Sequence, residues 1–557
     1  MHVFLFFIPG ILLIFSKAFN KKPLTEFLIY VVGLSLSFFV VLPWFMKYLN
    51  IPLMLSAYLV FIFSSVLMVV NIKRIDLKHL NADRQEILLI GIFLLVLLLR
   101  CMPMFFQIAP AGADMSMHSY IARLIYDNDG IPNSYRPLLP ISNFGAYPAG
   151  FPTLSALVSL LCDCPVYRSG LLMSCLAHAL ICFGLYILLL RFFDRNTAAA
   201  TSIAATFLTR SPQWIIRWGG NPTVLALFFF IIAFSLIIEL KEKPSWLKVI
   251  FASLSLAAVL ITHSIIFYVG GMILAVYFLV LIKDYKNIYA TAVCLFLFML
   301  IFLIPYLANL KFTLSKSAIE STRAWQMVDS RSVSYDLAAG ITFLLLSLFG
   351  LHLLLKKNRQ LAFAFLSITA ALIVLTMNFR FWFMPFSYIL YPGRVALALM
   401  IPLAVFAAPA ISKIITIQKK NLLIVFSIIG LSFYCIFYLY NSISMSPVTR
   451  TDMAAFKWID REIGKKAVFG NNYGDAGLWI PAIVGRTIMD PHSEPVHYEE
   501  LRARLRRYSA DYIYIGSKAV YGDIQYKKED LQKDPLKFKL IYINDGTQVW
   551  KVLEGVQ

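Results

Sequence analysis

One apolar run of the chain ends in a short segment whose side chains suit acid–base chemistry. Pro110 and Gly112 interrupt the run, and Asp114 and His118 follow four residues apart. Apolar side chains recur at helical spacing across residues 113–126, so the pattern predicts an amphipathic helix on which Asp114 and His118 share one side. A carboxylate at the start of such a helix can take a proton from an attacking hydroxyl, which is general-base catalysis.

Both residues also have structural explanations. Asp114 could cap the N-terminus of the helix, a frequent place for aspartate, and His118 could lie on the solvated face. Their spacing also suits two ligands of a divalent cation, although two ligands are fewer than a metal site needs. The sequence therefore leaves a divalent cation open and indicates no other cofactor.

Three arginines beside aromatic residues are candidates for binding an anion: Arg217, Arg380 and Arg394. A guanidinium group grips phosphate through two hydrogen bonds and stabilises negative charge that develops on a leaving group. Each could instead reach the membrane interface from a helix end. Arg394 is the first choice because it opens an apolar run after a Pro-Gly pair. His263, between two apolar runs, either faces the Asp114 loop or bonds a backbone carbonyl.

Other polar residues favour structural roles. Glu320, Arg323 and Asp329 have the mixed charge of a solvated loop, although that loop could also fold over a lipid. Trp479 and Arg486 lie in a Gly-rich stretch that lacks the residues of a phosphate-binding loop, so we expect turns there. Acceptor binding by Trp479 or Arg486 is the alternative.

Composition identifies the elements that must position these residues. Of 557 residues, 60% are hydrophobic and 14% are charged, and the mean hydropathy is +0.74. Soluble domains are about 45–50% apolar and roughly 25% charged, which excludes an ordinary soluble enzyme. Apolar runs of about 18 residues or more recur, each long enough to cross a bilayer. The composition predicts a mostly α-helical, polytopic integral membrane protein.

We expect about fourteen spans. The first is kept as a span because it lacks the basic start and cleavage site of a signal peptide. The segment at 197–210 is the weakest, and an error there would invert the topology that follows it. The segments are 1–15, 25–46, 51–70, 86–108, 166–190, 197–210, 221–240, 246–262, 264–282, 288–309, 337–355, 361–378, 395–411 and 421–440.

The distribution of charge orients these spans. The formal charge is +20, and residues 447–557 hold 17 Lys and Arg against 15 Asp and Glu, which leaves 33 against 15 for the rest. Alternate connections are uniformly basic, as expected of cytoplasmic loops. This places both chain ends and the loops 109–165 and 310–336 outside. The surplus charge therefore reports membrane orientation, and we expect no nucleic-acid partner.

The chain after residue 446 has the pattern of a small α/β domain. Residues 452–463 are amphipathic, and 467–470, 486–490 and 511–517 have the character of strands. Residues 540–553 predict a hairpin around Asn544-Asp545-Gly546. About 110 residues are enough for an independent core.

The loop after the fourth span resembles the first external loop of GT-C glycosyltransferases. The resemblance rests on the Asp114 element, on His118, on Gly130-Ile131-Pro132 and on residues 147–151, Tyr-Pro-Ala-Gly-Phe, and it is strongest over 86–190. It implies a GT-C-like transmembrane core and a donor sugar linked to polyprenyl phosphate.

These observations together predict three regions and a function. Residues 1–85 form three extra N-terminal spans, 86–446 the GT-C-like core, and 447–557 an extracytoplasmic domain. The resemblance implies a hexosyl- or pentosyltransferase of a prokaryotic cytoplasmic membrane, with a glycan, lipid or protein hydroxyl as acceptor. One carboxylate is enough for this transfer, whereas a glycosidase needs two.

Two other functions stay open. A transporter or flippase of lipid-linked saccharides would be expected to show internal repeats, and we find none that is convincing. A non-catalytic membrane assembly protein would use the C-terminal domain to dock a partner.

Overall fold

The computed structural model groups the chain into two compact units. Unit 1 comprises residues 1–101, 175–215 and 221–439, and unit 2 comprises 102–174, 216–220 and 440–557. The loop that carries Asp114 therefore belongs to the same unit as the C-terminal domain. The residues that the structure describes are 7–16, 18–19, 22–71, 73, 83–135, 148–209, 211–242, 244–281, 288–309, 326, 329–330, 340–381, 387, 390–417, 438–490, 505–520 and 525–553.

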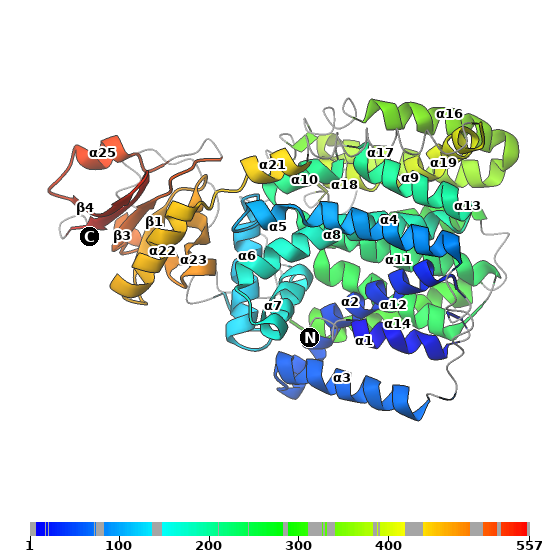
Figure 1. The fold of residues 1–557 in the computed structure, drawn as a ribbon, viewed down its shortest axis with the longest axis horizontal. Coiled ribbons are helices and arrows are strands. Elements are labelled where there is room, and N and C mark those ends of the chain that lie inside the picture. The colour runs from blue at the N-terminus through cyan, green and yellow to red at the C-terminus, as the bar shows by residue number, and fades with distance from the viewer. Residues whose placement is uncertain are drawn as a thin grey trace. The chain divides into compact units, whose positions relative to one another are not determined.

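The regular secondary structure of unit 1 is entirely helical among its described residues (Figure 1). Its helices are α1 (Ile8–Ile11), η2 (Leu12–Phe15), α2 (Leu24–Leu49), α3 (Leu53–Val70), α4 (Arg84–Cys101), α9 (Arg195–Phe207), α11 (Asn221–Glu242), α12 (Trp246–Thr262), α13 (Ser264–Leu281), α14 (Ile288–Leu307), α16 (Ile341–Lys357), α17 (Arg359–Phe381), α18 (Pro392–Leu397) and α19 (Met400–Ile417). Two further helices, α8 (Val166–Leu189) and α10 (Ser211–Trp218), contribute residues to both units.

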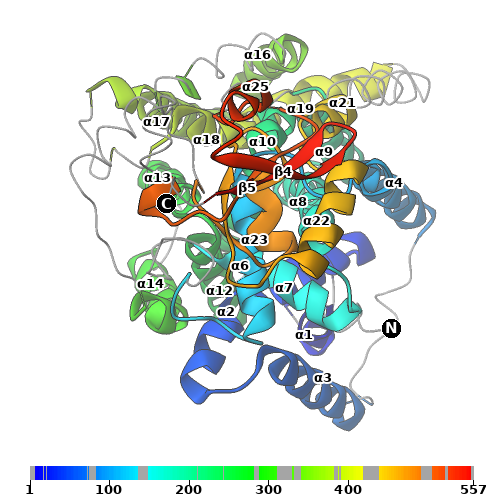
Figure 2. The same ribbon diagram turned by 90° about the vertical axis from the view of Figure 1, so that its left-hand side faces the viewer.

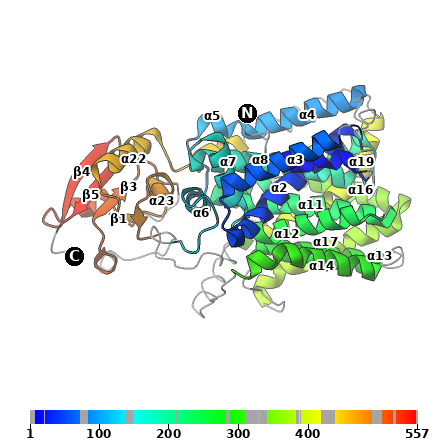
Figure 3. The same ribbon diagram turned by 90° about the horizontal axis from the view of Figure 1, so that it is seen from below.

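Helix α11 forms the centre of unit 1. Its apolar 18-residue window is completely buried, whereas only 22% of the corresponding window of α3 is buried. Both helices are apolar all round, so α11 meets other helices and α3 exposes its surface to the bilayer. Helix α12 packs against α2, α11 and α14, and the view from below shows this layer (Figure 3).

Nine helices among the described residues are long and apolar enough to cross a membrane, as expected of an integral membrane protein. Five of the expected fourteen segments are not among them. Residues 7–15 form only the short α1 and η2, α9 has 13 residues, and α12 and α16 have 17 each. The segment at 421–440 lies almost entirely outside the described residues, so fourteen stays a prediction.

A buried cluster of charges joins the N-terminal helices to the rest of unit 1. Lys22 Nζ contacts Glu26 Oε1 at 2.6 Å and Glu239 Oε1 at 2.7 Å, and Lys248 Nζ contacts Glu239 Oε2 at 2.8 Å. Arg191 contacts both carboxylates. The sequence predicts Lys22, Arg191 and Lys248 in three different cytoplasmic connections, and the structure brings them together.

Unit 2 contains the elements that surround Asp114 and a five-stranded sheet. Its helices are α5 (Pro103–Phe106), α6 (Asp114–Asp127), α7 (Gly150–Cys162), α21 (Tyr440–Ser444), α22 (Arg450–Glu462), η8 (Ala476–Trp479), α23 (Ile480–Ile483) and α25 (Lys528–Gln532). Its strands are β1 (Val468–Asn471), β2 (Thr487–Ile488), β3 (Tyr512–Ile515), β4 (Phe538–Asn544) and β5 (Thr547–Val552).

The sheet has the order β2-β1-β3-β5-β4. Strand β1 pairs in parallel with β2 and β3, and β5 pairs in antiparallel with β3 and β4. Asp545 and Gly546 have positive φ angles of 39° and 89° in the predicted hairpin, and α22 packs against β4 and β5 (Figure 2). The predicted α/β domain is present, with its elements within a few residues of their expected places.

Two buried carboxylates hold this domain together. Asp452 accepts hydrogen bonds from Tyr514 Oη at 2.8 Å and from the backbone N of Ser517 at 3.1 Å. Asp475 accepts from the backbone N of Gly477 and of Gly516, both at 2.7 Å. Burial raises the pKa of Asp475 to about 7, although these donors oppose the shift.

The stability of the region around Asp475 is therefore expected to fall as pH rises. The Asp475 carboxyl has a pKa of about 7 in the folded chain and about 3.9 in the unfolded chain. Between these pH values the folded state binds more protons than the unfolded state. The free energy of unfolding therefore falls as pH rises across this interval, by up to about 4 kcal/mol. Hydrogen exchange at the amides of Gly477 and Gly516, corrected for intrinsic rates, should show less protection at pH 8 than at pH 5. Asp475→Asn should remove most of this pH dependence of protection, whereas the control Asp530→Asn should leave the pH dependence unchanged.

Candidate active site

Asp114 is the first residue of α6. Ala113 occupies the N-cap position and makes no side-chain capping hydrogen bond. The capping role that the sequence left open for Asp114 is therefore wrong. The Asp114 side chain is half-buried at the positive end of the helix, where a carboxylate is electrostatically favoured.

Two glycines bring a second segment against the backbone of Asp114. Gly112 and Gly219 have φ angles of +94° and +95°, which residues with side chains rarely adopt. A Cβ on Gly112 would lie 2.1 Å from the backbone N of Gly219, and a Cβ on Gly219 would lie 3.2 Å from the backbone N of Asp114. The segment that carries Arg217 therefore packs directly on the turn that starts α6.

The sequence did not predict this contact. The pair Gly219-Gly220 after a tryptophan predicts a turn. Its partner Gly112 is about a hundred residues away in the chain, so no local pattern predicts their contact. The half-buried Arg217 lies two residues before Gly219 and shares unit 2 with Asp114. Of the three predicted arginines, only Arg217 belongs to this unit.

His118 lies one turn after Asp114 on the packed side of α6. Only 2% of it is exposed, and its ring centroid is 5.9 Å from that of Phe151 on α7. The solvated position that the sequence left open for His118 is therefore wrong. Ser119 is also buried, and Gly170 of α8 comes close enough that a Cβ there would lie 3.2 Å from Ser119 Oγ.

The chain that leads to the C-terminal domain runs beside the Asp114 turn. The Gly112 backbone N donates to the carbonyl O of Met445 at 3.3 Å, and Ser446 Oγ donates to the carbonyl O of Ala109 at 3.2 Å. Gln107 Nε2 donates to Ser442 Oγ at 2.6 Å. No pattern in the sequence indicated that residues 442–446 support the site.

Arg123 connects α6 to the C-terminal domain. Its Nη1 donates to the carbonyl O of Ala482 at 3.3 Å, and its Nε contacts Asp127 Oδ2 at 3.2 Å. Gly485, at φ +70°, leaves room for the guanidinium group, since a Cβ there would lie 2.9 Å from Arg123 Nη2. Helix α23 and η8 both pack on α6.

Arg123→Ala is expected to loosen this contact without unfolding either element. Loss of one partly exposed hydrogen bond and its packing should destabilise the contact by about 1 kcal/mol, a several-fold rise in local opening. Hydrogen exchange in the full-length protein should therefore be faster in α6 and α23, whereas β4 and β5 should be unaffected. If Arg123→Ala changes the exchange rates of all four elements equally relative to the wild type, Arg123 does not have this role.

Unit 1 contains four of the other predicted residues, namely Arg394, Arg380, His263 and Asp329. Arg394 stacks on Tyr391, with its guanidinium carbon 4.6 Å from the ring centroid. Beside it, Asp329 Oδ2 accepts from the backbone N of Gly393 at 2.7 Å. Arg380 is exposed in the last turn of α17. His263, 8% exposed, ends α12, and its backbone N donates to Val259 O at 2.7 Å.

The remaining candidates have mixed outcomes. Trp479 is fully buried, and Arg486 is 3% exposed with its guanidinium group donating to the carbonyls of Ile463, Gly464 and Val484. Acceptor binding by these two residues is therefore wrong. Glu320 and Arg323 lie outside the described residues.

The described residues do not assemble a metal site. No group of three or more His, Cys, Asp or Glu side chains among them could hold a metal ion. Asp114 and His118 alone are too few, and the burial of His118 against Phe151 does not suit a ligand open to substrate. We assign no step of the chemistry to a metal ion.

Comparison with known proteins identifies the fold. No protein-family profile matches the sequence, and no curated protein matches it. The apo oligosaccharyltransferase of Archaeoglobus fulgidus is similar in structure, with a TM-score of 0.54, 11% identity, and coverage of 77% of this chain and 69% of that one.

Two other structures of that archaeal enzyme are also similar. Its complex with Zn and sulfate has a TM-score of 0.52, 13% identity, and coverage of 83% and 73% of the two chains. Its complex with an inhibitory peptide and a dolichol-phosphate has a TM-score of 0.50, 13% identity, and coverage of 76% and 69%. The chain therefore shares the fold of this archaeal oligosaccharyltransferase, in agreement with the resemblance to GT-C glycosyltransferases noted in the sequence.

Proposed function

We propose that this chain is a membrane glycosyltransferase that moves a sugar from a polyprenyl-phosphate donor to a hydroxyl acceptor. The acceptor is a glycan, a lipid or a protein, and the reaction takes place on the external face of a prokaryotic cytoplasmic membrane. In this proposal the domain at 447–557 also lies outside.

The placement of Asp114 carries the proposal. Asp114 begins α6 after the Gly112 turn, and two separate segments support this turn, namely the Gly219 segment and residues 442–446. A fixed carboxylate at a helix start, within a fold shared with an oligosaccharyltransferase, suits a general base. The complex of that archaeal protein with a dolichol-phosphate supports a lipid-linked donor here.

The proposed reaction is a single displacement. Asp114 accepts the proton of the acceptor hydroxyl while the oxygen of that hydroxyl forms a bond to the anomeric carbon of the sugar. The bond between that carbon and the phosphate oxygen breaks, and polyprenyl phosphate leaves with the electron pair. Direct attack from the opposite face inverts the anomeric centre.

Binding of the phosphate is assigned to arginine side chains. Arg217 has the strongest support, because its segment packs on the start of α6. Arg394 and Arg380 are further candidates, and His263 is a possible hydrogen-bond donor to the same group. His118 has a positioning role in this proposal, because its burial against Phe151 fixes the rotation of α6.

Transfer and transport can be separated in one experiment. Vesicles that contain the purified protein receive a polyprenyl-phosphate-linked hexose or pentose labelled in the sugar, together with an alkyl glycoside as acceptor. The proposal predicts labelled product and free polyprenyl phosphate in equal amounts.

Two results would count against the proposal. Labelled lipid that equilibrates across the bilayer without any covalent product would indicate a transporter. Neither product nor movement with any combination of donor and acceptor would favour the assembly protein.

A further inference from the structure

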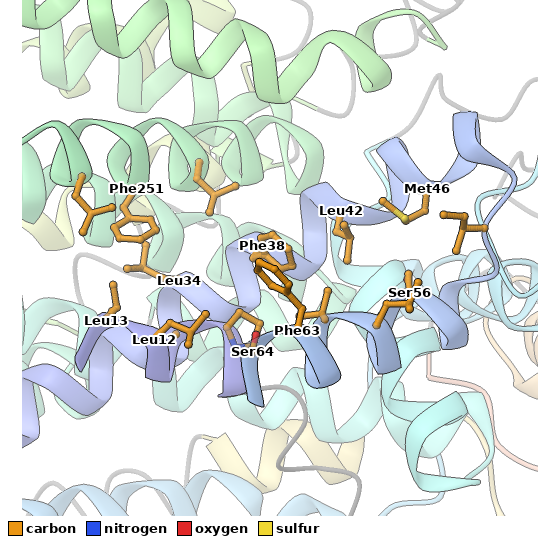
Figure 4. A pocket seen from close by; sticks show the side chains of 17 residues that line it. Leu12, Leu13, Leu34, Phe38, Leu42, Met46, Ser56, Phe63, Ser64 and Phe251 are labelled. Atoms are coloured by element: carbon orange, nitrogen blue, oxygen red, sulfur yellow. The ribbon is translucent and has the colours of Figure 1, made fainter. Parts of the chain in front are cut away.

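The N-terminal helices of unit 1 enclose an apolar groove (Figure 4). Its volume is about 570 Å³, and its walls come from α1, η2, α2, α3 and α12. Leu34, Phe38, Leu42 and Met46 form one wall along α2, and Phe251 extends it on α12. The groove lies entirely within one unit and contains none of the residues assigned to the transfer reaction.

The shape of the groove suits one extended chain. Leu34 and Met46 are twelve residues apart, so the groove follows α2 for about 18 Å at 1.5 Å per residue. This is more than half of the hydrocarbon thickness of roughly 30 Å. An extended occupant would therefore lie parallel to the helices.

The groove opens on the side of α3. Leu59 and Phe63 line it and are nevertheless 46% and 64% exposed. The exposed apolar surface of α3 continues from these residues to Ile62 and Val66. Because α3 is long and apolar enough to span the membrane, this opening faces lipid, and an occupant can enter sideways.

The chemistry of the lining selects a hydrocarbon. Among the described lining residues, only Ser56 and Ser64 have a polar side chain, and Ser56 Oγ already donates to the carbonyl O of Leu53 at 2.6 Å. None of these described residues carries a charged side chain that could hold a phosphate or a sugar. The lining therefore suits an apolar chain and leaves the headgroup of its lipid outside the groove.

We propose that this groove binds one acyl chain of a membrane phospholipid. The groove follows α2 for about 18 Å, which is close to the half of the roughly 30 Å hydrocarbon core that one acyl chain spans. One acyl chain therefore matches the length of the groove, whereas a polyprenyl chain of many isoprene units is longer. The groove is thus a lipid site separate from the proposed donor site.

Lipid retention by the full-length protein tests the proposal. The protein is purified in mild detergent and washed, and its phospholipid and polyprenyl lipid are counted by native mass spectrometry. Wild-type protein should keep about one phospholipid for each chain. Ser64→Phe, which fills the groove from α3, should lose it, and the matched control Ser65→Phe on the same helix should keep it.

A second measurement with another groove variant keeps the test decisive if the Ser64 variant misfolds. Adding phospholipid to delipidated protein should raise the Tm of the wild type and of Ser65→Phe, but not that of Leu42→Trp, which fills the groove from α2. Equal retention by wild type and both groove variants, or an equal Tm shift, would overturn the proposal. Retention of a polyprenyl lipid in place of phospholipid would also overturn it, because the acyl assignment rests on the length of the groove.

Discussion

Replacing Asp114 by Asn is expected to lower the rate of sugar transfer by about 10²–10⁴-fold, the range for loss of a general base. The amide keeps the size of the side chain but cannot accept the proton of the acceptor hydroxyl. Since Asp114 does not cap α6, the variant should fold, and the KM for the lipid-linked donor should change little. Steady-state kinetics in vesicles separate kcat from KM.

The matched control for this variant is Asp163→Asn. Asp163 is exposed and ends α7 at φ 48°, a conformation that asparagine tolerates well. This variant should transfer sugar at the wild-type rate. If Asp114→Asn also retains that rate in an assembled protein, another residue is the base.

Replacing Gly219 by Ala is expected to lower the kcat of sugar transfer by about 10²-fold. In this proposal residue 219 does not contact the substrate and acts by positioning Asp114. The new Cβ would lie 2.8 Å from the backbone N of Met115 in a backbone conformation that costs alanine about 1–3 kcal/mol. The start of α6 must therefore move, and a misplacement of about 1 Å at a reacting group has this effect on rate. The variant is measured by kcat together with Tm.

Gly130→Ala tests whether a glycine substitution near α6 is harmful in general. Gly130 follows the other end of α6, and its nearest contact to a new Cβ is 3.8 Å away. This control should keep wild-type kcat and Tm. A Gly219→Ala protein with normal kcat would show that the contact with the Gly219 segment does not position Asp114.

Local patterns predicted helix α6 well. The spacing of apolar residues after Gly112 is a property of one short segment, and α6 begins and ends within a residue of the predicted range. The hairpin at Asp545 and Gly546 was predictable for the same reason. In both places the residues that decide the conformation are neighbours in the chain.

The supports of the site could not be predicted in this way. Gly112 meets Gly219, and Ala109 meets Ser446, across separations that no local pattern encodes. The amphipathic pattern left open whether His118 lies on the solvated face, and its burial beside Phe151 was not visible in that pattern. Long-range packing decides which face of a short surface helix is covered.

The charge cluster at the base of α2 has a consequence for how the chain is made. Lys22 and Glu239 are 217 residues apart, so at about 5–20 residues per second roughly 10–40 s separate their synthesis. During that time Glu26, one turn away and of opposite charge, is the partner within this cluster that is already present. This neutral local pair lets the start of α2 wait at the membrane surface until Arg191, Glu239 and Lys248 arrive. The order of synthesis thus makes completion of the cluster a late step in assembly, after the inserted helix α11 carries Glu239 to its partners.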